Sequence, residues 1–401
     1  MIFRSLMAVL VASICLPIQA EPPRVDPKQT HALIVGVLQW QERSLTTYPK
    51  MKRQDVALRD QLVEMGVPKS NLTLLLDQKA TRSTIYRALE QLTESASSES
   101  TLIVYYAGHG MLNDQQGVFA NYDIQTNRMA STGWCLNDMA SQICKSFQGK
   151  RVLLFADCCF SGALSSVARQ LNESGIAAAS LTSASPSNTS TNNWTYTMSL
   201  IDLLRGQSLA DRNRDGMISI SEAGTEIEQA MSIHENQASG FSLFGVDQQF
   251  VLAPVQKATY KSDRLTPFSR GQYVQAREGR KWAAARILDF DGTRLAVQFQ
   301  EYNSRRVAWV PETNLRVSST LTPKLSKEEA LTKASVDGKY SKLLRTIKVK
   351  QDLETYGPFH EWGKWNQSSW GGHQGLPAGY WVYVYPRWYI WDVAREPIHA
   401  E

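Results

Sequence analysis

The sequence has little of what nucleic-acid-binding, zinc-binding and membrane-spanning proteins need. The net charge over 401 residues is only +5, with no dense run of lysine and arginine, so nucleic acid is not expected as the main partner. The 6 histidines and 5 cysteines show no zinc-binding spacing. No repeat of solenoid type is found. These absences leave an ordinary globular protein, and its length predicts two or three domains.

The N-terminal segment 1–20 has the pattern of a secretory signal peptide. Arg4 precedes an apolar run over 6–16, and Ala20 is a small residue at the expected cleavage point. The run is shorter than the roughly 20 apolar residues that cross a membrane, so a membrane anchor is the weaker alternative. We therefore expect a secreted or periplasmic protein with no membrane span after signal removal.

Four cysteines follow the signal peptide: Cys135, Cys144, Cys158 and Cys159. In an oxidising compartment an even number of cysteines favours disulfides, and Cys135 can pair with Cys144 across a short loop. A bridge between the adjacent Cys158 and Cys159 would be strained. At least one of these two is therefore expected to be a free thiol.

Strand and helix signals alternate over residues 28–255. Short apolar and β-branched runs predict strands at 32–37, 72–75, 102–106, 152–155 and 176–181. Helical spacing of apolar residues predicts helices at 55–65, 81–92, 135–147, 195–205 and 222–233. The polar segment 183–193 is predicted to be a loop. The alternation predicts an α/β fold class, with a mainly parallel sheet and helices on both faces.

The chain changes character beyond residue 255. Short alternating runs separated by turn signals predict a small, strongly bent β-barrel at 268–320, with Trp282, Tyr302 and Trp309 as core or cage aromatics. A linker at 321–345 leads to a Trp- and Tyr-rich module at 346–401. Aromatic residues exposed on that module would bind sugar or peptide, whereas buried ones would form its own core.

Candidate catalytic residues follow two of the predicted strands. One apolar run is followed by Gly-His109-Gly110, and another by Asp157-Cys-Cys159. Parallel strands would deliver the imidazole and the thiol to one edge of the sheet, where open α/β sheets place active sites. A cysteine attacks as the thiolate and needs such a partner, while the N–H groups of Gly110 and Cys159 can stabilise an oxyanion. The pattern predicts nucleophilic cysteine catalysis.

The segments Tyr106-Ala-Gly-His109-Gly110 and Asp157-Cys158-Cys159-Phe160-Ser161-Gly162 resemble the caspase-like cysteine peptidases of clan CD, peptidase family C14, in its metacaspase and orthocaspase branch. The resemblance covers about residues 32–252. It implies a caspase-like sheet, a protein or peptide substrate, His109 as general acid or base, and Cys159 as nucleophile. Cys158 would be the nucleophile only if the register slipped by one residue.

The resemblance also implies where a substrate side chain binds. In the branch that cuts after arginine or lysine, carboxylates at the positions of Asp157 and Asp55 line the pocket, and Asp123 is a further substrate-binding candidate. Two carboxylates can pair with one guanidinium. In the alternative interpretation, Asp55 is a carboxylate at a helix N-terminus that interacts favourably with the helix dipole. The Gln-Ala-Cys-x-Gly signature is absent, which argues against cleavage after aspartate.

Segment 211–222 fits the calcium loop of an EF-hand at every informative position. The oxygen ligands would come from Asp211, Asn213, Asp215, the Met217 carbonyl, Ser219 and Glu222. Gly216 would make the sharp turn. We expect one bound Ca²⁺, in a structural or modulatory role.

Together these patterns predict a secreted cysteine endopeptidase that cuts after Arg or Lys. Its C-terminal modules, one of them similar to SH3 or tudor barrels, would contact a cell-wall or protein partner. Two alternatives stay open. A weakly active or inactive pseudopeptidase would serve as a calcium-binding scaffold for these modules, and a calcium-gated protease would lose activity on chelation.

Overall fold

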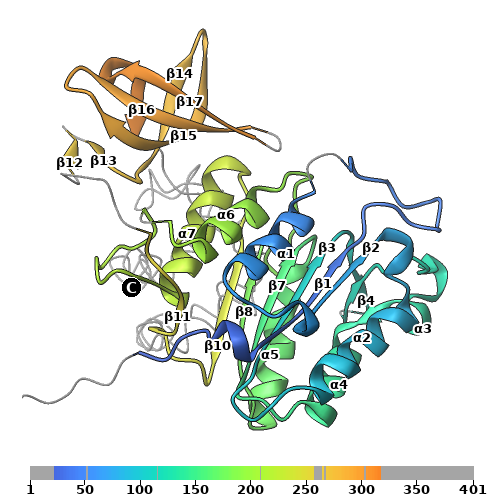
Figure 1. The fold of residues 1–401 in the computed structure, drawn as a ribbon. Helices are drawn as coiled ribbons and strands as arrows, with labels where there is room; N and C mark the ends of the chain where they lie inside the picture. Colours follow the sequence, from blue (N-terminus) through green and yellow to red (C-terminus); the bar gives the residue numbers. More distant parts are fainter. Residues whose placement is uncertain are drawn as a thin grey trace, which may run out of the picture.

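The structure is a computed structural model that describes residues 22–317, except 51–52, 115, 208, 257–263, 266–267 and 302–303. The predicted signal peptide, the linker, the Trp- and Tyr-rich module and Tyr302 lie outside the described residues. Within them, an α/β part with a large sheet is followed by a C-terminal antiparallel sheet (Figure 1).

Six strands form the central sheet, in the order β10-β8-β7-β3-β1-β2. They are β1 (Thr30–Gly36), β2 (Leu72–Leu76), β3 (Thr101–Ala107), β7 (Arg151–Asp157), β8 (Ala177–Thr182) and β10 (Gly240–Phe244). All run parallel except β10, which is antiparallel to β8. Every residue of β3 is buried, which explains its unbroken apolar run. The predicted mainly parallel sheet is confirmed.

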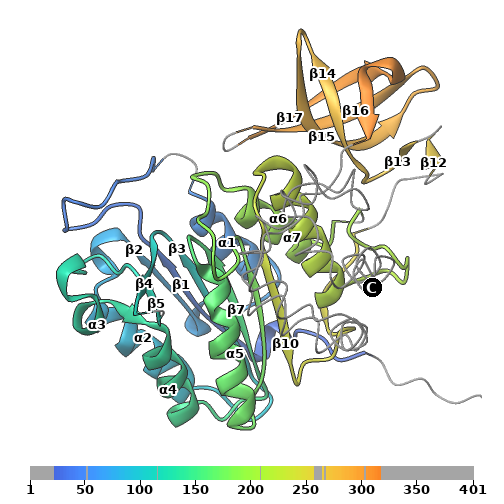
Figure 2. The same ribbon diagram turned by 180° about the vertical axis from the view of Figure 1, so that it is seen from behind.

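Helices cover both faces of this sheet, as the β-α alternation predicted. One face carries α2 (Arg82–Glu94), α4 (Leu136–Ser146) and α5 (Leu164–Glu173), which lie in front in Figure 2. The other face carries α1 (Gln54–Glu64), α6 (Thr195–Leu204) and α7 (Ile220–His234). Helix α5 was not predicted, although its buried residues have helical spacing: Leu164, Val167, Ala168 and Leu171.

Capping side chains explain where two of these helices begin. The Thr81 hydroxyl accepts a hydrogen bond from the Thr84 N–H at the start of α2, at 3.3 Å. At the start of α7, Ser219 and Glu222 form a reciprocal capping box. None of the described helices is long and apolar enough to cross a membrane.

Several short elements were not predicted. A three-stranded sheet contains β4 (Gly110–Asn113), β5 (Gln116–Phe119) and β6 (Trp134–Cys135), with α3 (Met129–Thr132) between the last two. Strand β9 (Met217–Ser219) pairs with β11 (Val251–Pro254). Single 3₁₀ turns occur at Pro27–Gln29, Lys69–Asn71, Asp77–Lys79, Thr126–Arg128, Ser161–Ala163 and Glu312–Asn314. Elements of two to four residues are too short for a period to show in the sequence.

Five antiparallel strands form a sheet where the barrel was predicted, in the order β17-β16-β15-β14-β18. They are β14 (Tyr273–Glu278), β15 (Lys281–Phe290), β16 (Arg294–Glu301), β17 (Ser304–Pro311) and β18 (Leu315–Val317), preceded by β12 (Arg264–Leu265) and β13 (Phe268–Ser269). The sheet has its own apolar core around Val274, Ile287 and Val297. Trp282 and Trp309 are partly exposed and stand outside that core.

A buried ion pair joins this sheet to the α/β part. Arg286 of β15 contacts Glu226 of α7 through both guanidinium ends, with Nη2 2.9 Å from Oε2. The Tyr273 hydroxyl donates to the same carboxylate at 2.9 Å. Because both charged side chains are almost fully buried, separating them would be costly, and the contact holds the sheet on α7.

Candidate active site

The histidine and the cysteine lie at the carboxyl ends of two neighbouring strands. β3 and β7 pair in parallel with Ala107 opposite Asp157. His109 and Cys159 each follow two residues later, so the register brings both to one edge of the sheet. The strand order reverses at this edge, because β2 lies on one side of β1 and β3 on the other. Binding sites in open α/β sheets lie at such reversals.

The glycine after the histidine packs directly against the cysteine. A Cβ atom at Gly110 would lie 1.9 Å from the Cys159 carbonyl oxygen and 2.9 Å from the Cys158 sulfur. No larger residue fits there without moving the backbone. The contact places Gly110 and Cys159, the two predicted oxyanion donors, side by side.

Both ring nitrogens of His109 are engaged by the segment that follows β1. Nε2 lies 2.8 Å from the Thr46 carbonyl oxygen, and Nδ1 lies 2.7 Å from the Tyr48 hydroxyl. Because a carbonyl only accepts, the hydrogen bonds assign the proton to Nε2, and Nδ1 accepts from Tyr48. Burial lowers the pKa of His109, so the ring is neutral at pH 7.

Two aromatic rings pack around the same imidazole. The Trp40 ring centroid lies 4.4 Å from that of His109, and the Tyr48 centroid 4.7 Å. The Trp40 indole N–H donates to the Ala120 carbonyl at 2.8 Å, which anchors the ring. Burial also raises the pKa of Tyr48, so its hydroxyl keeps the proton that it donates. The imidazole is held by packing as well as by hydrogen bonds.

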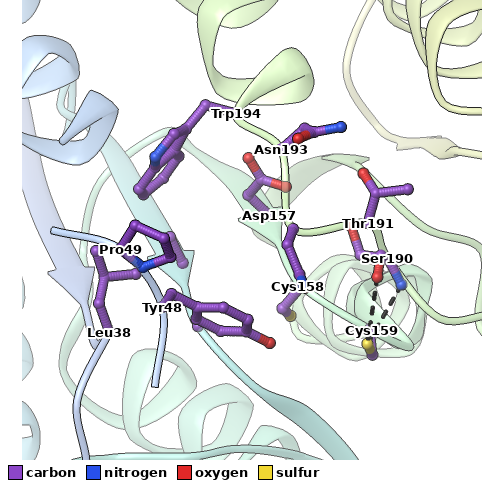
Figure 3. A pocket seen from close by; sticks show the side chains of 13 residues that line it. Leu38, Tyr48, Pro49, Asp157, Cys158, Cys159, Ser190, Thr191, Asn193 and Trp194 are labelled. Carbon is purple, nitrogen blue, oxygen red and sulfur yellow. Dashed lines mark hydrogen bonds between the residues drawn. The ribbon is translucent and has the colours of Figure 1, made fainter. Parts of the chain in front are cut away.

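A different segment engages the sulfur of Cys159. Its Sγ accepts a hydrogen bond from the backbone N–H of Ser190, with 3.2 Å between nitrogen and sulfur (Figure 3). The next residue, Phe160, has a left-handed backbone with φ of 55°, and its N–H donates to the Asn188 carbonyl at 2.9 Å. A side chain in this conformation persists only where its surroundings hold it. Residues 188–190 therefore fix the cysteine turn.

The two adjacent thiols have different environments. Cys158 is 2% exposed and belongs to the apolar core, where burial raises its pKa well above the usual value. Cys159 is partly exposed beside the pocket. Because the thiolate is the attacking species, burial makes Cys158 the poorer nucleophile. Both thiols are free.

The disulfide considered for Cys135 and Cys144 is not formed. Both are free, and they stand at opposite ends of α4. A rise of about 1.5 Å per residue puts their Cα atoms roughly 13 Å apart, whereas a disulfide needs less than about 7 Å. The Cys144 thiol instead donates to the Ser174 hydroxyl at 3.3 Å.

A small pocket, with a cavity volume of about 40 Å³, opens beside Cys159 (Figure 3). Its lining comes from the carboxyl ends of β1, β3 and β7 and from the loop before α6. The lining residues are Leu38, Tyr48, Pro49, Ala107, Gly108, Asp157, Cys158, Cys159 and residues 190–194. Among these described residues Asp157 is the only charged one. The pocket is therefore a mostly uncharged cleft with one carboxyl group.

Asp157 is held inside this pocket by a chain of hydroxyl groups. The Thr197 hydroxyl of α6 donates to its Oδ2 at 2.6 Å, and the Tyr105 hydroxyl lies 2.6 Å from the same threonine oxygen. Asp157 is 9% exposed. Burial raises its pKa to about 7, so near neutral pH it exists in both the neutral and the charged form.

Asp55, the second carboxylate predicted for the pocket, does not line it. Its side chain is fully buried and pairs with Arg53, with 2.6 Å between Nη2 and Oδ2. Arg53 also donates to the Gly36 carbonyl at 2.9 Å and pairs with Asp77 at 2.7 Å. Asp55 thus does not join Asp157 in the pocket lining, and Arg53 offsets the charge of Asp55. The position of Asp55 in the first turn of α1 fits the alternative interpretation, in which the carboxylate interacts with the helix dipole.

Asp123 also lies outside the pocket lining. It accepts hydrogen bonds from the Arg82 N–H and from the Asn121 side chain, both at 2.8 Å. The first of these satisfies a backbone donor at the start of α2. The contacts of Asp123 are those of a residue that ties a loop to a helix.

The predicted calcium loop 211–222 makes the expected turn but directs its carboxylates at its own backbone. Gly216 has φ of 83°, and its N–H donates to Asp211 at 3.1 Å. One oxygen of Glu222 accepts from the N–H and hydroxyl of Ser219, and the other accepts from the backbone near the loop start. Over the described ranges, no group of three or more His, Cys, Asp or Glu side chains is gathered as a metal site requires.

Several residues of the site were not identified from the sequence. Thr46 and Tyr48 contact the histidine, Ser190 contacts the cysteine, and Thr197 holds Asp157. Two of these contacts use backbone atoms, which carry no sequence signal. Ser190 does lie in the segment that was predicted to be a loop, but its position beside Cys159 depends on the tertiary fold.

An imidazole and a partly exposed thiol at paired strand ends, beside a pocket, define the site class of a cysteine hydrolase with an α/β fold. The family model described as the caspase domain (peptidase C14) matches residues 29–260, more than half of the chain. The chain belongs to this caspase-domain peptidase family.

Caspases are among the solved structures that the chain is similar to. Caspase-1 of Spodoptera frugiperda shares 16% identity, with 61% of this chain and 98% of that chain covered and a TM-score of 0.42. A protein of Geobacter sulfurreducens shares 13% identity, with 57% and 99% covered and a TM-score of 0.40. The Drosophila initiator caspase Dronc shares 9%, with 59% and 90% covered and a TM-score of 0.38. None of the curated proteins matches the chain.

Proposed function

We propose that the protein is a cysteine endopeptidase in which Cys159 attacks the peptide carbonyl and His109 moves the protons. The observation that carries this proposal is the strand register. Ala107 of β3 lies opposite Asp157 of β7, and His109 and Cys159 each follow two residues later. The close approach of Gly110 to Cys159 supports it, because the two residues proposed to donate their backbone N–H groups to an oxyanion are in contact.

The reaction begins with the release of His109 Nδ1 from the Tyr48 hydroxyl. Nδ1 then takes the thiol proton of Cys159, and the thiolate attacks the carbonyl carbon. His109 returns the proton to the leaving amine as the C–N bond breaks, which leaves a thioester on Cys159. Water, deprotonated by His109, then attacks the thioester carbonyl. The C–S bond breaks, the acid product leaves, and the Cys159 thiolate takes the proton back from His109. Throughout, the Thr46 carbonyl accepts from Nε2–H and stabilises the charged imidazolium.

The substrate residue before the cut bond is arginine or lysine in this proposal, recognised by Asp157 alone. Asp157 is the one carboxyl group in the described pocket lining, whereas the charge of Asp55 is offset by Arg53. A guanidinium or ammonium group entering the pocket favours the ionised form of Asp157. The neutral remainder of the lining offers no competing cation.

The loop 211–222 binds Ca²⁺ in the same proposal. Asp211, Asn213, Asp215, the Met217 carbonyl, Ser219 and Glu222 supply oxygen atoms, which suit this ion. Calcium would provide charge compensation for the carboxylates. Binding requires Glu222 to give up its hydrogen bonds to Ser219 and to the loop backbone. Isothermal titration with Ca²⁺ tests this part, and absence of binding in Glu222→Gln would support it.

Turnover of fluorogenic peptides with arginine or lysine before the cut bond tests the proposed activity. The full chain without the predicted signal peptide should cleave them, and Cys159→Ala should abolish cleavage. Cys144→Ala is the matched control, because this thiol lies on α4, outside the pocket lining. Equal turnover by wild type and Cys159→Ala would rule out Cys159 as the nucleophile.

A second candidate function is a binding scaffold that uses the same fold without catalysis. It is favoured by one observation: both nitrogens of His109 and the sulfur of Cys159 have other partners in this structure. A scaffold would cleave none of these peptides, with or without Ca²⁺.

We also propose that the protein is exported by the signal peptide predicted at residues 1–20. Fractionation of cells expressing the full chain would test this.

A further inference from the structure

The loop at 183–193 forms one wall of the substrate pocket and touches the nucleophile. Residues 190–193 line the pocket, and the Ser190 N–H donates to the sulfur of Cys159 at 3.2 Å. The loop is rich in serine, threonine and asparagine and contributes no large apolar side chain to the core. Something other than hydrophobic packing must therefore hold this N–H in line with the sulfur.

The segment that follows α7 supplies those contacts. The Ala238 carbonyl accepts from the Ser185 N–H at 3.0 Å and from the Asn188 side chain at 3.2 Å. The Glu235 carboxylate accepts from the Asn193 side chain at 2.8 Å. These bonds attach both ends of the loop to one short segment.

Gln237 lies in the middle of this segment and reaches the centre of the loop. Its Oε1 accepts from the Thr191 N–H at 2.8 Å. Its Nε2 donates to the Ser190 hydroxyl at 3.1 Å and to the Ser183 carbonyl. The side chain is 4% exposed. Because the acceptor and both donors of the amide are used, only a carboxamide of this length satisfies all three partners.

We propose that Gln237 is a positioning residue for the nucleophile. It acts through Ser190 and Thr191: by bonding to both, it orients the Ser190 N–H toward Cys159, where that N–H stabilises the developing thiolate. The inference rests on the proposed function, which assigns the nucleophile to Cys159. Hydrogen bonds to a charged acceptor are stronger than those to a neutral one, so this N–H favours the thiolate over the thiol.

Two substitutions separate this role from simple packing. Gln237→Met keeps the volume but loses all three hydrogen bonds. Gln237→Glu keeps the shape and the acceptor for Thr191, but it cannot donate to the Ser183 carbonyl while ionised. The Glu variant therefore tests the positioning role even if the Met variant does not fold. Gln248→Met, at an exposed position in the turn before β11, is the matched control.

The measurement is the rate of Cys159 alkylation by iodoacetamide across pH 5–10, with the modified residue identified by mass spectrometry. Loss of one hydrogen bond to the thiolate should lower the rate at pH 7 about tenfold and move the midpoint of the rate profile to higher pH. Gln248→Met should match wild type. An unchanged rate and midpoint in a folded Gln237→Glu protein would overturn the inference.

The same measurement distinguishes this inference from the proposed function, because alkylation needs no peptide substrate. If wild type cleaves no peptide but the Gln237 variants shift the alkylation profile, the peptidase proposal fails and the positioning role stands. If wild type cleaves peptides and the profile does not shift, the positioning role fails and the peptidase proposal stands.

Discussion

The two halves of the site are held in different ways. On the histidine side, the segment after β1 closes on the imidazole with two aromatic rings, a hydroxyl and a carbonyl. On the cysteine side, the sulfur contacts the backbone of a single residue in a polar loop: it accepts from the Ser190 N–H and donates weakly to the Ser190 carbonyl, at 3.9 Å. The base is therefore fully satisfied at rest, whereas the thiol is lightly held. In the proposed mechanism, the histidine must therefore leave an existing partner before it acts, whereas the thiol needs little rearrangement.

Removing the base should have the largest effect. His109→Ala should lower kcat for an arginine peptide by about 10³-fold, because general acid-base catalysis contributes on this order. The matched control is His31→Gln. This histidine lies at the amino end of β1, away from the carboxyl edge that carries the site, and its substitution should leave kcat near that of wild type. Comparable losses in both variants would show that the effect comes from the fold rather than from the base.

Arg53 lies at the carboxyl end of β1, where the segment that holds the histidine begins, and its loss should destabilise the protein. Arg53→Met leaves the fully buried Asp55 without its partner, which should lower the free energy of unfolding by about 3 kcal/mol. Urea denaturation measures this change. Arg59→Met removes a surface pair with Asp60 and should cost less than about 1 kcal/mol. Equal costs would mean that the buried pair is not a structural anchor.

Substitution of Asp157 tests the cysteine side of the site through its effect on substrate specificity. Asp157→Asn should lower kcat/KM for arginine and lysine peptides about 30-fold, since a hydrogen-bonded ion pair in the pocket contributes about 2 kcal/mol. Peptides with a neutral residue at the same position should be cleaved as by wild type. A uniform loss for both kinds of peptide would assign Asp157 to the structure rather than to recognition.

The raised pKa of Asp157 also predicts how stability changes with pH. The folded protein keeps its proton until about pH 7, while the unfolded chain loses it near pH 4. Stability from this group is therefore complete below pH 4 and is lost as the pH rises to 7, by up to about 1.4 kcal/mol per unit. Urea denaturation at pH 5 and 7.5 should show wild type losing stability relative to Asp157→Asn. A constant difference would contradict the shift.

The smallest predicted effect concerns the contact that keeps the histidine satisfied. Tyr48→Phe removes the hydroxyl from His109 Nδ1 but keeps the ring, and kcat/KM should rise about fivefold because one hydrogen bond of about 1 kcal/mol no longer opposes release. Tyr86→Phe, which removes a hydroxyl bonded to Asp138 on another face, is the control. A fall in kcat/KM would mean that Tyr48 assists the base instead of restraining it.

The two catalytic side chains could be predicted from the sequence, whereas most of their partners could not. His109 and Cys159 were predicted because they directly follow buried strands, and the order of parallel strands determines where those ends meet. The pairing of Asp55 with Arg53 was missed, because a carboxylate on a first helical turn looks the same in the sequence whether it faces a substrate or a neighbouring arginine. Tyr48, Ser190 and Gln237 act across loops, whose paths depend on the completed fold.

The central claim is that Cys159 and His109 form one catalytic unit once the histidine is released. Labelling with an arginine chloromethyl ketone, followed by mapping of the modified residue, tests it most directly. Wild type should carry one adduct on Cys159, at a rate that falls sharply in His109→Ala. An adduct on Cys158, or labelling of Cys159 at the same rate without the histidine, would contradict the claim.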